Sequence, residues 1–120
     1  MGKKVLIVED HITTAEMISS ILYEYSTVAA YDGKTGLRKV AEEKPDLIIT
    51  DILLPDMIGI DLIRKVKSDP ATAGIPIIAV SVKVEKHDVD AAKAAGAAEY
   101  LRKPFDPKEF REKVKHYLGE

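Results

Sequence analysis

The sequence has 120 residues, of which 46% are hydrophobic and 32% charged, a balance typical of a single soluble globular domain. Its 18 basic and 20 acidic residues are scattered and sum to a net charge of −2, which argues against direct nucleic-acid binding. Cysteine is absent, which excludes disulfides, thiolate metal sites and cysteine nucleophiles and favours a reducing compartment. The first apolar run, residues 5–8, is too short for a signal peptide or a membrane span. We therefore expect one cytoplasmic domain over residues 1–120.

Five short apolar runs alternate with segments of helical periodicity. The runs lie at residues 5–8, 27–30, 47–50, 77–80 and 98–101. The first, third and fourth are continuously hydrophobic and mostly β-branched, which is typical of parallel strands covered on both faces. This alternation predicts an α/β domain with a doubly wound parallel sheet and helices on both faces, while the pattern leaves two common strand orders open.

The helical segments carry apolar stripes and start signals. Thr13 and Glu16 have the spacing of a capping box, and Asp106 followed by Pro107 predicts an N-cap and a first-turn proline. Residues 23–28 contain no glycine to end the first helix, so we expect the second strand to be short or irregular. The segment around residues 87–95 is mostly alanine, with Val89 as its main large anchor, and we expect it to be the least firmly packed. The stripes are Ile18–Ile21–Leu22–Tyr25, Leu37–Val40–Ala41, Leu62–Ile63–Val66 and Phe110–Val114–Tyr117–Leu118.

Polar residues follow the predicted strands at the edge where ligands of open α/β sheets bind. They are Glu9 and Asp10 after the first run, Asp51 after the third, Ser81 after the fourth and Lys103 after the fifth. Three crowded acids repel one another, and a divalent cation together with the lysine relieves that repulsion. Oxygen ligands indicate Mg²⁺ or Mn²⁺, and such an ion keeps open positions for water and a phosphate oxygen. The edge therefore predicts phosphoryl chemistry. The three histidines are scattered and expected to be solvated, and only His11 adjoins the acidic pair.

Taken together, these residues resemble the receiver domains of two-component response regulators, the fold of the chemotaxis protein Y. The resemblance covers essentially all 120 residues and implies a flavodoxin-like, five-stranded parallel sheet in the order 2-1-3-4-5. It implies a signalling domain rather than an enzyme, assisting only its own phosphorylation and dephosphorylation. The motifs that carry it are Glu9–Asp10, the segment 51–59, Ser81, Tyr100 and Lys103–Pro104–Phe105.

The resemblance implies that Asp51 accepts a phosphoryl group from a phosphohistidine donor. It also implies that Asp10, Asp51 and the backbone carbonyl of Leu53 bind Mg²⁺ (or Mn²⁺) directly, while Glu9 acts largely through water. Lys103 is expected to pair with the phosphoryl oxygens, and its peptide bond to the following proline is expected to be cis.

The switch that the resemblance implies involves Ser81 and Tyr100. Ser81 is expected to donate a hydrogen bond to the phosphoryl group, and Tyr100 to move inward behind it. The face made by the fourth helix, fifth strand and fifth helix would then change shape for a downstream partner, whose identity the sequence does not state. The expected donor is a sensor histidine kinase or a histidine phosphotransfer protein, and we expect a monomer or a weak phosphorylation-dependent dimer with no membrane contact.

Two residues depart from the family pattern, and other functions remain to be weighed. Val82 stands where relatives commonly carry alanine or glycine, which predicts slow phosphorylation by small donors. Leu53 is expected to hinder attacking water and lengthen the phosphorylated lifetime.

The main alternative is an interaction module that works without phosphorylation. A phosphatase with an aspartate nucleophile is disfavoured, because it needs a second acid at residue 53, where this sequence has leucine. Flavin binding is also disfavoured, because the loop after the first strand carries acids instead of the small residues that bind a phosphate.

Overall fold

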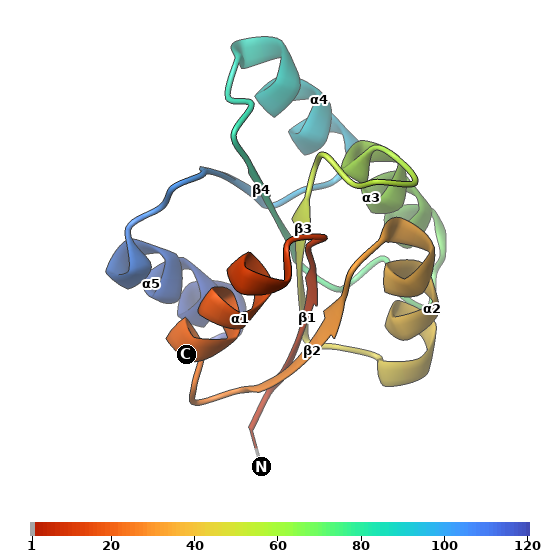
Figure 1. Ribbon diagram of the computed structural model, residues 1–120. Helices are drawn as coiled ribbons and strands as arrows, with labels where there is room; N and C mark the ends of the chain where they lie inside the picture. Colours follow the sequence, from red (N-terminus) through yellow and green to blue (C-terminus); the bar gives the residue numbers. More distant parts are fainter. Residues whose placement is uncertain (1) are drawn as a thin grey trace.

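In the computed structural model, which describes residues 2–120, five strands alternate with five helices, as the sequence predicts (Figure 1). The strands are β1 (Lys4–Val8), β2 (Ser26–Ala30), β3 (Leu47–Asp51), β4 (Ile77–Ser81) and β5 (Glu99–Arg102). The helices are α1 (Ile12–Ile21), α2 (Gly33–Glu43), α3 (Gly59–Ser68), α4 (Lys86–Ala95) and α5 (Pro107–Tyr117).

All five strands are parallel and lie in the order β2-β1-β3-β4-β5, which confirms the expected fold class. At their carboxyl ends Val8 pairs with Thr50, and Ser81 pairs with Arg102. Because the strands run in one direction, the residues that follow them emerge at the same edge of the sheet. The topology thus places the polar residues singled out in the sequence along one rim.

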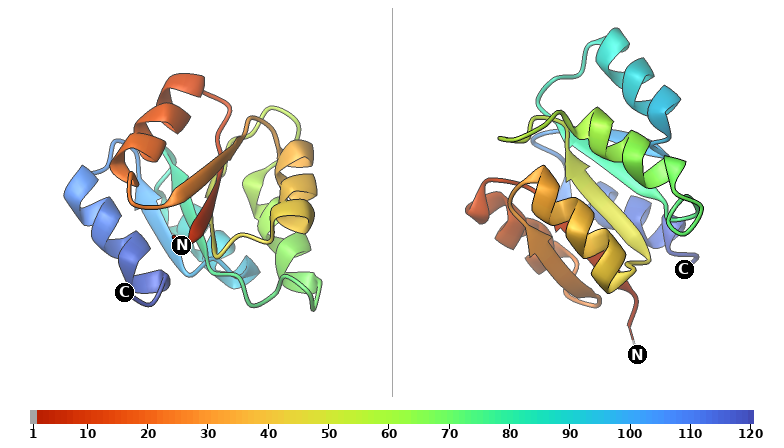
Figure 2. Two further views of the ribbon diagram at one scale, coloured as in Figure 1. Left: turned by 90° about the horizontal axis from the view of Figure 1, so that it is seen from below. Right: turned by 90° about the vertical axis from the view of Figure 1, so that its right-hand side faces the viewer.

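Helices cover both faces of the sheet (Figure 2). Helices α1 and α5 pack on one face through a cluster that includes Ile18 and Phe110, and α2, α3 and α4 pack on the other around Leu62. The central strands β3 and β4 are buried along their whole length, whereas β2 and β5 are only partly buried. This agrees with the continuous hydrophobic runs of the central strands, which have helices on both sides.

Three local predictions are wrong. Helix α1 begins at Ile12 with His11 at the N-cap, and within residues 2–120 no side chain caps it, so Thr13 and Glu16 do not form the capping box. The helix also ends at Ile21, which leaves Tyr25 outside it, buried in front of β2. Strand β2 is regular and pairs with β1 over all five residues. Pairing with β1, which periodicity does not reveal, accounts for the regular second strand.

The predicted start of α5 and the light packing of α4 are confirmed. Asp106 is the N-cap of α5, and its side chain accepts a hydrogen bond from the Glu109 backbone N–H at 3.2 Å. In α4 the buried residue is Ala92, and Val89 is half-buried. Across the part of the chain described here, no helix combines the length and the apolar character needed to cross a membrane.

Candidate functional site

The carboxyl edge of the sheet brings together the rim residues expected from the sequence. Asp51 is the last residue of β3, and Ser81 is the last residue of β4. Glu9 follows β1 directly, and its backbone N–H donates to the carbonyl oxygen of Ala30, which extends the β1–β2 pairing to the rim. Lys103 follows β5, and its backbone N–H donates to the carbonyl oxygen of Ser81. Backbone hydrogen bonds of the sheet therefore fix all four positions.

Lys103 joins the carboxylates of two strands. Its ammonium Nζ donates to Asp51 Oδ2 at 2.7 Å and to Glu9 Oε1, and both carboxylates are buried. Burial opposes the charge on Lys103, but hydrogen bonds and charge attraction from Asp51 and Glu9 outweigh it and raise the pKa of the ammonium. The lysine is thus a fixed positive charge at neutral pH, placed between two acids that would otherwise repel each other.

The carboxylate of Asp51 is held at both oxygens but still reaches a pocket. Oδ2 accepts from Lys103, and Oδ1 accepts from the backbone N–H of Leu53 at 2.9 Å. A pocket of about 320 Å³ opens beside it, lined by His11, Thr14, Asp51, Leu53, Val82 and Lys103. Side chains of Leu53 and Val82 are 46% and 63% exposed, so two apolar groups flank the opening. The arrangement presents an oriented carboxylate next to a cation, at a pocket flanked by two apolar side chains.

The loop between β3 and α3 is pressed against the backbone of Asp51. The Gly59 N–H donates to the carbonyl oxygen of Ile52 at 2.7 Å, and a Cβ at Gly59 would lie 2.7 Å from the Ile52 Cα. Earlier in the loop, Asp56 accepts from the backbone N–H groups of Gly33 and Lys34 at 2.7 and 2.9 Å. These bonds lower the pKa of Asp56. The sequence motif contained both residues without revealing that they attach this loop to α2 and β3.

Asp10 follows Glu9 at the same rim and lies next to an imidazole. His11 Nδ1 is 3.3 Å from Asp10 Oδ1 and 3.3 Å from Glu9 Oε2. Asp10 Oδ1 is inaccessible to solvent and has no hydrogen-bond partner within residues 2–120. A buried carboxylate oxygen without a donor is costly unless a cation or water completes it. Oxygen donors of this kind at the same rim as Asp51 fit a hard divalent cation such as Mg²⁺.

The two residues expected to act as a switch meet at one loop residue. The buried Ser81 Oγ accepts from the backbone N–H of Lys83 at 3.1 Å, and the Tyr100 hydroxyl donates to the Lys83 carbonyl oxygen. Tyr100 is partly buried against the α3–α4 side of the core, and this burial raises the pKa of its hydroxyl. The Lys103–Pro104 peptide bond is cis, as expected.

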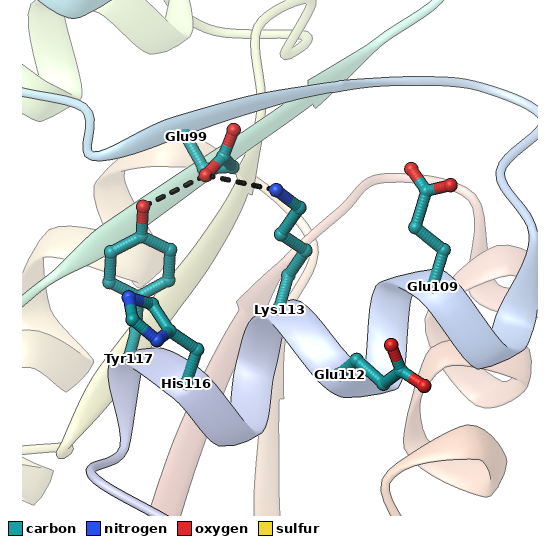
Figure 3. A pocket seen from close by; sticks show the side chains of 6 residues that line it. All are labelled: Glu99, Glu109, Glu112, Lys113, His116 and Tyr117. Atoms are coloured by element: carbon teal, nitrogen blue, oxygen red, sulfur yellow. Dashed lines mark hydrogen bonds and ion pairs between the residues drawn. The ribbon is translucent and has the colours of Figure 1, made fainter.

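A larger hollow of about 410 Å³ lies between β5 and α5, away from this rim (Figure 3). Glu99 occupies it with two partners, the Tyr117 hydroxyl at 2.8 Å and Lys113 Nζ at 3.6 Å. In Figure 3 Glu109 and Glu112 stand apart from this group on α5. The hollow has no carboxylate held by a buried cation, so the smaller pocket at Asp51 is the candidate site.

The fold and the rim together define a receiver domain. The sheet is parallel in the order β2-β1-β3-β4-β5, and its carboxyl edge carries acids at two strands, a hydroxyl at the fourth and a lysine before a cis proline. The family model described as the response regulator receiver domain matches residues 5–115. The chain therefore belongs to the response-regulator receiver family of two-component signalling.

Individual relatives agree with this assignment. The DNA-binding response regulator MtrA of Mycolicibacterium paratuberculosis is 36% identical over 120 residues, with 98% of this chain and 52% of MtrA covered. A putative response regulator from Chloroflexus aurantiacus has 34% identity and a TM-score of 0.94, covering 100% of both chains. The receiver domain of the sensor histidine kinase PA1611 of Pseudomonas aeruginosa, solved with a magnesium ion in its active-site cleft, has 26% identity and a TM-score of 0.90 over 100% of both chains. The present chain spans about half the length of MtrA.

Proposed function

We propose that this domain accepts a phosphoryl group on Asp51 from a phosphohistidine donor and signals through the change that follows. The observation that carries the proposal is the contact of Lys103 with Asp51 and Glu9 beside an open pocket. The phosphoryl group of a donor carries negative charge, and an ammonium fixed next to the acceptor reduces the repulsion. The same residues match the family motif in order, which supports the assignment of roles.

In the proposed reaction a carboxylate oxygen of Asp51 forms the new bond to phosphorus while the P–N bond of the donor breaks. The imidazole of the donor leaves with that electron pair, and the product is an aspartyl phosphate. Lys103 holds the acceptor and then has a phosphoryl oxygen as an additional partner. Ser81 lies one strand away, and its Oγ accepts a hydrogen bond from the Lys83 N–H. In the proposed product the Ser81 hydroxyl donates a hydrogen bond to the phosphoryl group.

Asp10, Asp51 and the Leu53 carbonyl are the groups proposed to hold Mg²⁺ or Mn²⁺, with Glu9 acting through water. When bound, such an ion supplies positive charge that stabilises the oxygens of the transferred group. The orphaned Asp10 Oδ1 supports this assignment because it is a buried acceptor with no donor in the described chain. Glu9 has a further task, since its two oxygens accept from Lys103 and from the His11 backbone N–H.

The proposed signal passes from Ser81 and Tyr100 to α4, β5 and α5. Both side chains bind Lys83, in the loop that leads into α4, so a change at Ser81 alters a bond that Tyr100 shares. Helix α4 buries little, and few contacts must be remade when it moves. A downstream protein would recognise this face, and the donor would be a sensor histidine kinase or a histidine phosphotransfer protein. Cytoplasmic location and a monomer that dimerises weakly on phosphorylation complete the proposal.

The proposal is tested by incubating the chain with acetyl phosphate and Mg²⁺ and measuring intact mass. We expect the mass to increase by one phosphoryl group, and alkaline hydroxylamine to remove that group. When Mg²⁺ is chelated before the reaction, the increase should not occur. Asp51→Asn should abolish the gain, whereas Asp69→Asn, a matched change at an exposed loop residue, should not. If neither acetyl phosphate nor a phosphohistidine donor modifies the wild-type chain, the result would instead favour an interaction module that works without phosphorylation.

A further inference from the structure

Strand β2 forms one edge of the sheet, and a lysine covers one of its outward-facing backbone groups. Among residues 2–120, β2 ends the strand order and pairs with β1 alone, with α1 on one side and α2 on the other (Figure 2). Lys39 of α2 reaches this edge, and its Nζ donates to the carbonyl oxygen of Ala29 at 3.0 Å. We propose that Lys39 is an edge guard, which prevents β2 of one copy of this chain from pairing with β2 of a second copy.

The pairing with β1 decides which groups of β2 face outward. The Ser26 N–H and the Ala30 carbonyl oxygen both bond residues that flank β1. Backbone groups alternate in direction along a strand, so Thr27 and Ala29 turn their N–H and carbonyl groups to the open edge. A further strand would bond to these outward groups. Lys39 occupies the Ala29 carbonyl oxygen and so removes one acceptor from the row.

The strand itself has no other protection against pairing. Its five residues, Ser26–Ala30, carry no charge and no proline, and they pair with β1 in unbroken register, without a bulge. Charges, prolines and bulges are the usual means by which edge strands avoid joining one another. The edge is also accessible on the α1 side, where a groove of about 200 Å³ lies between α1 and β2, lined in part by Ser19, Thr27 and Tyr31.

The charge of Lys39 is not neutralised by a neighbouring acid. Glu43, one turn further along α2, bonds Lys4 Nζ at 2.9 Å, and no carboxylate of the described chain lies within ion-pair distance of Lys39. Two identical β2 edges would pair about a two-fold axis, which brings both Lys39 ammonium groups to one seam. Pairing would therefore either bury two like charges together or break both bonds to Ala29. Replacing the lysine removes the repulsion and frees the carbonyl oxygen.

This inference is independent of phosphorylation at Asp51. Strands β2 and β5 are opposite edges of the sheet, and the face proposed to bind a downstream partner includes β5. The test therefore uses the unphosphorylated full chain, and its failure would leave the proposed function standing. A chain that is never phosphorylated could still be kept from β2 pairing by Lys39.

Sedimentation equilibrium over a series of protein concentrations tests the proposal on the wild type and on Lys39→Ala. We expect the variant to self-associate at least about tenfold more tightly than the wild type. Lys34→Ala is the matched control, since Lys34 is an exposed lysine of the same helix, and it should behave like the wild type. Lys39→Arg keeps both a donor and a charge, so it should also behave like the wild type.

Hydrogen exchange of backbone amides separates edge pairing from non-specific association. In Lys39→Ala, the outward-facing amides of Thr27 and Ala29 should exchange more slowly as the protein concentration rises, because a second strand covers them. In the wild type their exchange should not depend on concentration. The proposal would be overturned if Lys39→Ala associates no more tightly than the wild type, or if Lys34→Ala associates as tightly as Lys39→Ala. Association that leaves exchange at Thr27 and Ala29 unchanged would also overturn it.

Discussion

Helices α3 and α4 pack side by side on the same face of the sheet, yet they are attached to the candidate site in different ways. Helix α3 buries Leu62, Ile63 and Val66, and its first residue, Gly59, is pressed against the backbone that follows Asp51. Helix α4 buries Ala92 and follows an exposed loop. In Figure 1 α4 lies at the margin of the molecule. Asp51, the proposed acceptor at the end of β3, is therefore followed by a loop fixed to the more deeply packed helix α3. The loop before the lightly packed α4 is bound by Ser81 and Tyr100 through Lys83.

The largest effect expected from this comparison is on the free energy of unfolding. Leu62 in α3 is fully buried, and Leu62→Ala should destabilise the domain by about 3 kcal/mol through lost burial and a cavity. Val89 in α4 is half-buried, and Val89→Ala should cost less than about 1 kcal/mol. Urea unfolding of both variants measures the difference. Equal losses would mean that the two helices are equally anchored.

A smaller loss of stability is expected at the start of α3. A methyl group at Gly59 would meet the backbone of Asp51 and Ile52, which cannot move aside as a flexible side chain can. Gly59→Ala should therefore cost about 2 kcal/mol and slow phosphorylation, because it displaces the acceptor. Gly74→Ala is the control, since a Cβ there has open space and should leave both measurements unchanged. Unchanged stability and phosphorylation rate in Gly59→Ala would show that the backbone at the start of α3 can move aside.

The lifetime of the phosphorylated state tests whether Leu53, in the loop between β3 and α3, shields the proposed acceptor Asp51 from water. Leu53 is half exposed at the mouth of the pocket, and its apolar side chain gives no hydrogen bond to an attacking water. Leu53→Asn should speed loss of phosphate roughly tenfold, equivalent to about 1.4 kcal/mol in the barrier. The measurement is the decay of phosphorylated protein by intact mass. A decay no faster than that of the wild type would remove the shielding role of Leu53.

The smallest effect is expected in the acid range and concerns Asp56, which ties the loop before α3 to the start of α2. The backbone N–H groups of Gly33 and Lys34 lower its pKa below the ordinary value of 3.8. A lowered pKa in the folded state means that this contribution to stability is complete above about pH 4 and is lost as the pH falls through the folded pKa. Asp56→Asn should therefore be less stable than the wild type at neutral pH, with the gap narrowing in acid. Urea midpoints across this range measure it, and a constant gap would contradict the assignment.

The rim could be predicted from the sequence because parallel strands place their carboxyl ends at one edge. Asp51, Ser81 and Lys103 each follow an apolar run, so their proximity follows from topology. The spacing of Thr13 and Glu16 does not reveal that α1 begins at Ile12, directly after His11, whose backbone N–H donates to Glu9.

Other parts of the site depend on contacts between distant segments, which periodicity does not reveal. Asp56 binds backbone groups more than twenty residues earlier in the chain. The geometry of His11 likewise depends on how Glu9 is held by a lysine near the other end of the domain.

Lys103 bonds to Glu9 and Asp51, which lie 94 and 52 positions earlier in the chain. During synthesis, a ribosome that has released Glu9 and Asp51 has not yet released the cation that joins them. The acidic rim thus exists for a time without its neutralising partner, and β5 must dock before the proposed acceptor is complete. A nascent or truncated chain that lacks β5 and Lys103 would present Asp51 without the ammonium on which the proposed reaction depends.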